Sequence, residues 1–275
     1  MRIREMMKID LHTHTSDSFD CELSVESVLA RARKIGLNAI AITDHDTMSA
    51  CGIARKAAGN LIIIPGMEIT STGGTHMIGL FLQEEVVSKD IIDIIDEIHE
   101  QRGLVLLPHP FRPKTGLVSN KEQRNLLDGE QLARILSRVD LIEAVNYRCD
   151  LEATINTDRF FSFYPDVPRV AGSDAHIDYE IGKAYVELED VKSYSPDDIK
   201  DSLLFSPRTI RFEVYSDEAV REVKEARSDG KRKTLAFRTR SIIPAGFRRS
   251  IRTIYRRSAG RIISGRNKKF KMKVR

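Results

Sequence analysis

The residues of this chain that could do chemistry are histidines and carboxylates at or beside the ends of predicted strands. Six of the seven histidines follow this pattern, and most of them have an acidic residue nearby. The candidates are His12, His14, His45, Glu68, His76, His109, Asp174 and His176. Imidazole and carboxylate groups bind borderline and hard divalent metal ions, so the set predicts a site for several ions. His99 lies among acidic residues on a predicted helix and is interpreted as part of a solvated face.

Two pairs of candidates are separated by a single residue. His12 and His14 point to the same face of a strand, because side chains in a strand alternate with a period of two. Two imidazoles on one face can chelate one ion. Asp174 and His176 repeat this spacing after Gly172, which gives the backbone conformational freedom at a strand end.

Four further carboxylates lie close to candidate histidines and allow more than one interpretation. Asp17 and Asp20 lie in a polar loop, where either could close the metal site and where both suit turn formation. Asp44 and Asp46 flank His45, so one of them could orient the imidazole through its other nitrogen. Asp46 could also cap the helix that follows it.

Glu68 ends an apolar strand, where a buried carboxylate without a partner would be energetically costly. A position bridging two metal ions would satisfy this carboxylate. His76 and His109 each lie beside an apolar run, where a single histidine is more often a hydrogen-bonded core residue. In the company of the other candidates, both are predicted to be metal ligands.

The elements that must position these residues alternate between strands and helices. Strands are predicted at 8–15, 38–46, 61–70, 75–82, 104–111, 141–147, 167–176 and 183–189, and helices at 24–35, 49–58, 89–103, 121–139, 152–163 and 195–204. The alternation is typical of an α/β fold with a parallel sheet, and the number of units favours a closed, TIM-like barrel. The C-terminal ends of barrel strands form one rim, where the candidates would converge. His76 is the exception, because it lies near the start of its strand.

The charge of the chain is distributed unevenly. Residues 231–275 contain 17 Lys and Arg and no Asp or Glu, so the other 230 residues carry a net charge of −13. We therefore predict a barrel over residues 1–220 and a basic extension over 221–275 that is partly helical or disordered. Within it, 241–263 has apolar residues near helical spacing with arginines between them. This pattern predicts contact with nucleic acid, an anionic membrane or an acidic partner.

Composition also bears on the cellular compartment. No segment approaches the roughly 20 apolar residues of a membrane-spanning helix, and the first residues lack the apolar core of a secretory signal. Cys21, Cys51 and Cys149 are far apart and odd in number, which argues against a disulfide framework. We therefore expect a cytoplasmic protein without a transmembrane segment.

The ordered set of motifs resembles the PHP (polymerase and histidinol phosphatase) family. The residues that carry the resemblance are DLHTHT (10–15), ITDHDT (42–47), PGMEIT (65–70), HMIGL (76–80), HPF (109–111) and GSDAH (172–176). They span residues 8 to about 190, and their order and spacing match the family pattern throughout. The resemblance implies a distorted seven-stranded barrel that holds two or three divalent ions, commonly manganese, iron or zinc.

The resemblance also implies how the ligands are shared among the ions. A first ion would be held by His12, His14, Glu68 and Asp174, a second by Glu68, His76 and His109, and a third by Asp20, His45 and His176. Asp20 is preferred to Asp17 on this alignment. Cys21 occupies the position after it, where family members usually have glycine, so the chain departs from the family pattern in the loop of the third ion.

These inferences predict a metal-dependent hydrolase of phosphoesters, a phosphatase or phosphodiesterase that uses a hydroxide activated by two or three metal ions. Its substrate would be a phosphorylated small molecule, a nucleotide or an oligonucleotide. Asp44, Asp46 or His176 could handle protons, and Arg112 could clamp the substrate phosphate, as could Lys114 or Arg148. Two alternatives are a small-molecule phosphatase of the histidinol-phosphate type and a non-catalytic, metal-bearing module whose basic extension binds nucleic acid.

Overall fold

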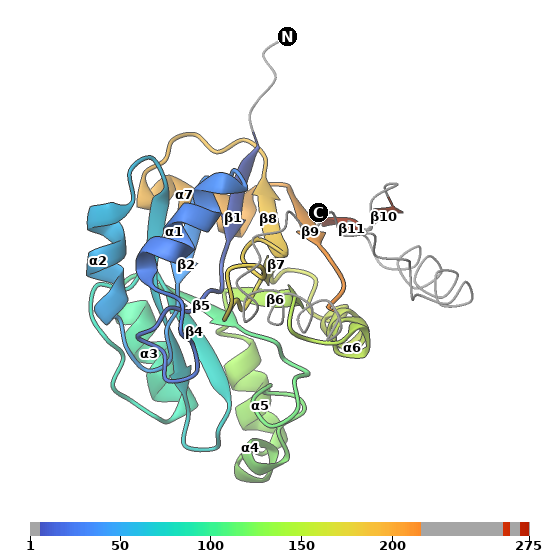
Figure 1. The fold of residues 1–275 in the computed structure, drawn as a ribbon. Helices are drawn as coiled ribbons and strands as arrows, with labels where there is room; N and C mark the ends of the chain where they lie inside the picture. The colour runs from blue at the N-terminus through green and yellow to red at the C-terminus, as the bar shows by residue number, and fades with distance from the viewer. Residues whose placement is uncertain (1–5, 216–260, 265–269, 275) are drawn as a thin grey trace, which may run out of the picture.

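The computed structural model describes residues 6–215, 261–264 and 270–274 (Figure 1). Its strands are β1 (Met7–Asp10), β2 (Ala39–Ile42), β3 (Ile62–Thr70), β4 (His76–Leu80), β5 (Leu104–Leu107), β6 (Leu141–Asn146), β7 (Arg169–Gly172), β8 (Ala184–Leu188), β9 (Arg208–Phe212), β10 (Arg261–Ser264) and β11 (Phe270–Val274). Its helices are α1 (Val25–Lys34), α2 (Ser49–Ala57), α3 (Ile91–Glu100), α4 (Lys121–Leu126), α5 (Gly129–Leu136), α6 (Leu151–Phe161) and α7 (Pro196–Phe205). Every strand predicted from the sequence has a counterpart in this order.

The strands form one curved sheet in the order β10-β11-β9-β8-β1-β2-β3-β4-β5-β6-β7. An isolated parallel bridge between Thr13 and Ala175 joins the chain after β1 to the chain after β7. The bridge brings the two ends of the β1–β7 series together, so the sheet is nearly closed. The predicted distorted, TIM-like barrel is therefore confirmed.

The sheet is not purely parallel, which corrects the prediction from strand–helix alternation. β4 runs antiparallel to both β3 and β5, and β8 and β9 are also antiparallel to their neighbours. Only a short loop joins β3 to β4, and such a loop permits an antiparallel return but is too short for a parallel crossover. The reversal has a direct consequence for His76, described below.

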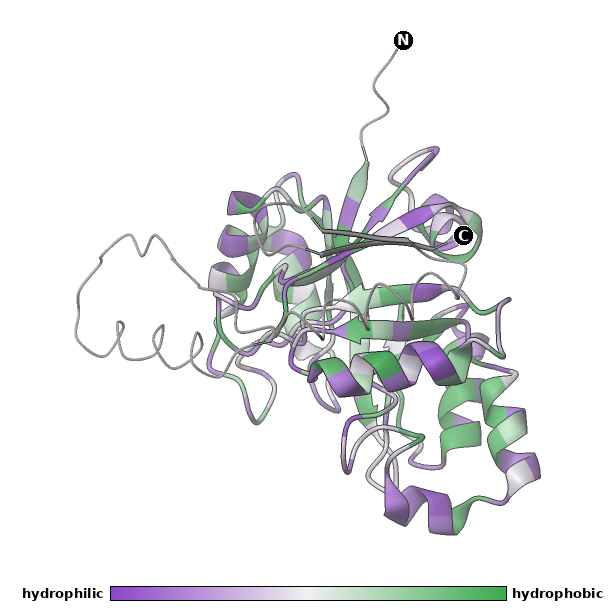
Figure 2. Cartoon of the chain, turned by 90° about the vertical axis from the view of Figure 1, so that its right-hand side faces the viewer, coloured by the Kyte–Doolittle hydropathy of each residue, from purple (hydrophilic) through white to green (hydrophobic). Residues whose placement is uncertain are grey.

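Helix boundaries follow local capping chemistry. The Asp90 side chain accepts hydrogen bonds from the backbone of Ile92 and Asp93 and begins α3, whose Ile94 and Ile98 are buried. The single helix predicted over 121–139 is instead α4 and α5, because Asp128 begins a new helix with a complete capping box. In Figure 2 hydrophobic and hydrophilic segments alternate along the covering helices, as expected for helices that bury one side.

The C-terminal part adds two strands that the sequence analysis did not predict. β11 pairs antiparallel with β9, itself not predicted, and β10 pairs antiparallel with β11. Most of the amphipathic segment 241–263 and the predicted boundary at residue 220 lie outside the described residues; the end of that segment, from 261, is strand rather than helix. Within the part of the chain that the structure describes, no helix is both long and apolar enough to cross a membrane.

Candidate metal centre

The candidate ligands meet at one rim of the barrel because of how the strands end there. His12 and His14 follow β1, His45 follows β2, His109 follows β5, and Asp174 and His176 follow β7. Glu68 lies near the end of β3, where a parallel bridge links it to His45. His76 is the first residue of β4 and pairs in register with Thr70, the last residue of β3. Because β4 is antiparallel, its start lies at the rim where β3 ends, so His76 joins the other candidates.

Glu68 lies at the centre of this cluster, with its two carboxylate oxygens facing different histidines. Oε1 is 2.8 Å from His76 Nδ1 and 2.9 Å from His109 Nε2. Oε2 is 3.0 Å from His12 Nε2 and 3.2 Å from His14 Nε2. The side chain is almost completely buried, with 1% of its surface exposed. A carboxylate in this arrangement can bridge two ions, one at each oxygen.

The spacing of the nitrogen and oxygen atoms fits bound cations. His12 Nε2 and His14 Nε2 are 3.1 Å apart, and Asp174 Oδ1 lies 3.6 and 3.4 Å from them. Ligand atoms about 2.0–2.2 Å from a shared ion are separated by about 3.0–3.6 Å. Among the described residues, His45 Nδ1 and His109 Nδ1 are buried without a hydrogen-bond partner, and the first lies 3.6 Å from Glu68 Oε2. The other nitrogens of these two rings face candidate ligands, His45 Nε2 toward Asp20 and His109 Nε2 toward Glu68.

A second part of the cluster lies nearer to the surface. Asp20 Oδ2 is 2.9 Å from His176 Nε2 and 3.6 Å from His45 Nε2, and His14 completes a group able to hold an ion. The Asp20 side chain is 36% exposed. Asp17, the alternative that the sequence left open, instead accepts a hydrogen bond from Ser49 Oγ at 2.7 Å. The structure therefore brings Asp20, rather than Asp17, to the histidines.

Electrostatics within the cluster favour positive charge. Burial by itself would raise the pKa of Glu68, but His12 and His76 outweigh it and hold this pKa well below its ordinary value. Burial would lower the pKa of His14, but hydrogen bonds that the imidazole donates to Asp174 and Glu68 dominate and raise it to about 9. The carboxylates thus stabilise added positive charge, which a proton or a metal ion can supply.

His109 shows the opposite behaviour. Burial, followed by the nearby charge of Arg112, lowers the pKa of His109 to about 4. This imidazole is therefore neutral near pH 7, the protonation state that metal coordination requires.

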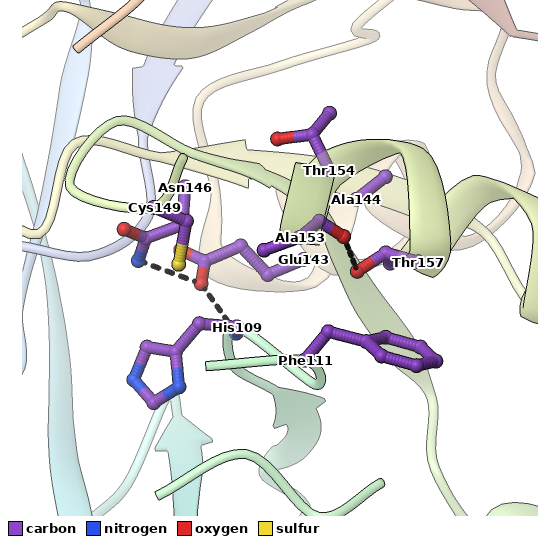
Figure 3. Close-up of a pocket in the computed structure, with 9 residues that line it drawn as sticks. All are labelled: His109, Phe111, Glu143, Ala144, Asn146, Cys149, Ala153, Thr154 and Thr157. Atoms are coloured by element: carbon purple, nitrogen blue, oxygen red, sulfur yellow. Dashed lines mark hydrogen bonds between the residues drawn. The ribbon is translucent and has the colours of Figure 1, made fainter. Parts of the chain in front are cut away.

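Two orienting residues were missed by sequence reasoning. Glu143 in β6 contacts His12 Nδ1 at 3.0 Å and accepts hydrogen bonds from the His109 backbone at 2.8 Å and from Asn146 Nδ2 at 2.9 Å (Figure 3). Ser18 Oγ contacts His14 Nδ1 at 2.9 Å. Such contacts fix the ring orientation of ligating histidines. The available signal was a lone charged residue, Glu143, inside the apolar run LIEAVNY (141–147).

Asp44 and Asp46, predicted to be catalytic, lie beside the cluster with other partners. Asp44 accepts hydrogen bonds from the Thr15 backbone and hydroxyl. Asp46 accepts from the Thr70 backbone at 3.0 Å and from Lys89 Nζ at 2.6 Å. Within residues 6–215, neither carboxylate belongs to a group of potential ligands. These contacts position the loops of the rim, and the proposed proton transfers remain predictions.

The predicted phosphate-binding cations differ in their surroundings. Arg112 donates to Asp174 Oδ2 and, at 3.2 Å, to Asn146 Oδ1, and 24% of its side chain is exposed. Arg148 Nη1 lies 3.8 Å from Glu180, and Lys114 is on the exposed surface. Arg112 is thus the cation that the structure places against a candidate ligand.

The backbone of the rim is tightly constrained. A Cβ atom at Gly172 would lie 2.3 Å from His12 Cβ, so only glycine allows β7 to approach β1 this closely. Asp174 and His109 have positive φ angles of 54° and 27°, which are uncommon for residues other than glycine. Strained conformations of this kind concentrate at functional sites, where the surrounding structure holds them in place.

Comparison with known proteins agrees with this geometry. Residues 10–193 match the family model of the PHP domain. The chain belongs to the PHP family. Family membership and the ligand groups at the rim confirm the predicted class, a metal-dependent hydrolase of phosphoesters.

Relatives of this PHP protein differ in how much of the chain they cover. An uncharacterized protein of Methanocaldococcus jannaschii is 32% identical over 196 residues, which cover 70% of this chain and 75% of the relative. The 5′-3′ exoribonuclease Rnm of Escherichia coli is 40% identical over 73 residues, a quarter (25%) of each chain. The first match covers most of this chain, whereas the second covers a quarter of it.

Solved structures share the fold at low sequence identity. PsfC from Pseudomonas syringae aligns with a TM-score of 0.59 at 16% identity, covering 82% of this chain and 100% of that protein. A Bifidobacterium adolescentis protein assigned as a metal-dependent phosphoesterase aligns with a TM-score of 0.51 at 16% identity, covering 71% and 95%. At this identity the likeness is one of fold alone.

Proposed function

We propose that this PHP protein hydrolyses phosphoesters of nucleotides or oligonucleotides with two or three divalent ions, manganese, iron or zinc. The observation that carries the proposal is the position of Glu68. Its two oxygens face separate histidines, with His76 and His109 at one oxygen and His12 and His14 at the other. This division is expected of a carboxylate that bridges two ions.

The ligand sets that the family resemblance implies are adopted for the ions. One ion would take His12, His14, Glu68 and Asp174, a second would take Glu68, His76 and His109, and a third would take Asp20, His45 and His176. Divalent ions bound in such a centre polarise a phosphoryl oxygen and lower the pKa of a bound water.

The protein's own residues would orient the substrate around this centre. Arg112 extends its guanidinium group to Asp174 and Asn146 and remains 24% exposed, so it can also donate hydrogen bonds to a substrate phosphate. His176 lies at the open side of the cluster, where Nδ1 is 2.9 Å from the Asp174 carbonyl oxygen. This contact fixes the ring so that Nε2 faces Asp20, the orientation in which both side chains could hold the third ion.

Two observations support a nucleotide or oligonucleotide substrate. The local match to the exoribonuclease of Escherichia coli includes 40% identity over 73 residues. The segment 231–275, with 17 basic and no acidic residues, could neutralise the phosphates of a nucleic acid.

The proposal is tested with the full chain loaded with Mn²⁺, Fe²⁺ or Zn²⁺. Turnover of p-nitrophenyl phosphate, bis(p-nitrophenyl) phosphate and a short oligonucleotide is measured, with metal content determined by elemental analysis. We expect hydrolysis of at least one ester, with the oligonucleotide reaction falling steeply as salt rises and the small esters much less affected. If the protein binds metal but turns over no ester, the proposed hydrolytic activity is refuted and a metal-bearing binding module is favoured.

A further inference from the structure

An aromatic ring lies at the solvent-exposed side of the metal centre, next to His45 and Asp20. Phe19 is 84% exposed, and its ring stacks on the imidazole of His45 with centroids 5.0 Å apart and an interplanar angle of 28°. One face of the ring is therefore directed to a candidate ligand, while most of the ring surface meets solvent. Phe163 and Phe205 are each 81% exposed, and neither has a ring contact with a candidate ligand within residues 6–215.

The loop that carries Phe19 is anchored on both sides of the ring. Ser18 Oγ accepts a hydrogen bond from the His45 backbone at 2.8 Å and contacts His14 Nδ1 at 2.9 Å. Asp20 on the other side lies 2.9 Å from His176 Nε2. Because Ser18 and Asp20 both contact the cluster, the loop holds the phenyl ring at this exposed side of the metal centre. A ring held in advance loses little conformational entropy when a ligand packs against it.

We propose that Phe19 is a stacking platform for a nucleobase of the substrate, placed beside the phosphoester that reacts at the metal centre. The inference rests on the proposed function and narrows its substrate class to phosphoesters that carry a base. Aromatic side chains stack on bases of any identity, since every base has a π face. The platform should therefore favour substrates with a base over those without one, with little preference among bases.

The test compares two single-stranded pentanucleotides, one of mixed sequence and one in which every sugar lacks its base. Four proteins are loaded with Mn²⁺: the wild type, Phe19→Ala, Phe19→Tyr and the control Phe205→Ala. Phe205 is 81% exposed, close to the 84% of Phe19. We measure kcat/KM and, by fluorescence polarisation, equilibrium binding of both oligonucleotides. Elemental analysis of each variant reports whether the metal content is unchanged.

Phe19→Ala should lower kcat/KM and affinity for the base-bearing strand by about 5- to 150-fold, the loss typical of one stacking contact. Its values for the base-free strand should change little. Phe19→Tyr keeps the aromatic ring and should therefore retain most of the wild-type kcat/KM and affinity for the base-bearing strand. Phe205→Ala should match the wild type in both.

Three results would overturn the inference. They are an equal loss on both strands, no loss on either, or a loss that Phe19→Tyr does not rescue. An equal loss accompanied by reduced metal content would assign Phe19 to the support of His45. If the wild type turns over neither strand, oligonucleotide hydrolysis is refuted as part of the proposed function, and the binding measurement alone still decides whether Phe19 recognises a base.

Discussion

The metal centre has two parts that differ in burial and in the elements that carry them. The deep group, His12, His14, Glu68, His109 and Asp174, is at most 2% exposed and, together with His76 at the start of β4, lies on or directly after strands of the barrel. The outer group consists of Asp20, His45 and His176. Its carboxylate belongs to a loop and is 36% exposed, whereas Glu68 in the deep group is 1% exposed.

This difference indicates separate tasks for the two groups. The deep carboxylates are buried, so they require cations or hydrogen-bond donors around them. The histidines around these carboxylates are also held in orientation by Glu143, which contacts His12 Nδ1 and the backbone of His109. The outer group has solvent access and lies beside the exposed ring of Phe19. We therefore expect the deep ions to be held tightly and the outer ion to exchange readily.

Glu68→Gln should have the largest effect, because it removes a charge that serves both halves of the deep group. Loss of a bridging ligand should exceed the 10- to 100-fold effect typical of orienting residues, so we expect phosphoesterase activity to fall by more than about 100-fold. Elemental analysis should find that the deep ions are depleted. Glu130→Gln, on the exposed face of α5, is the matched control. Full metal content in Glu68→Gln would contradict the bridging position.

Glu143→Gln should have the next largest effect, although Glu143 is not itself a predicted ligand. Its two oxygens contact His12 Nδ1 and the His109 backbone, and a glutamine would turn an amide nitrogen toward one of these donors. We expect metal affinity of the deep group to fall by about 10- to 100-fold. Competition with a fluorescent chelator measures the affinity. An unchanged value would remove Glu143 from the support of the deep group.

The deep group was largely accessible to sequence reasoning because its positions follow from strand periodicity. His12 and His14 share a face by alternation, and apolar runs locate the strand ends that carry Glu68 and His109. The direction of β4 was not accessible, since it depends on the loop after β3 rather than on the strand itself. For that reason His76 was an exception in the sequence and is part of the cluster in the structure.

Contacts between distant segments were the features that the sequence could not supply. Glu143 reaches His12 across 131 residues, and Phe19 meets His45 only once its loop has folded against the segment that follows β2. Residue chemistry left Asp17 and Asp20 equivalent because both suit a polar turn, and only the family resemblance favoured Asp20. The loop conformation distinguishes them, since it directs Asp20 to His176 and Asp17 to Ser49.

Asp20→Asn tests whether the outer group is separable from the deep group. The asparagine retains an oxygen but loses the charge that faces His45 and His176, so the outer ion should bind at least about 10-fold more weakly. Metal content should fall by one ion per chain at low free metal, and the deep ions should remain. Simultaneous loss of all ions would show that the two groups bind as one unit.

Asp17→Asn should have the smallest effect and completes a matched pair with Asp20→Asn, because each removes one negative charge from the same loop. Asp17 contacts Ser49 Oγ, and an asparagine can still accept this hydrogen bond. Surface changes of this kind alter free energies by no more than about 0.5 kcal/mol, so activity and metal content should stay within about two-fold of the wild type. Titration of Asp17→Asn and Asp20→Asn with Mn²⁺ compares the activity and the metal content of the two variants. If Asp17→Asn lost the outer ion and Asp20→Asn kept it, the assignment of the loop ligand would be reversed.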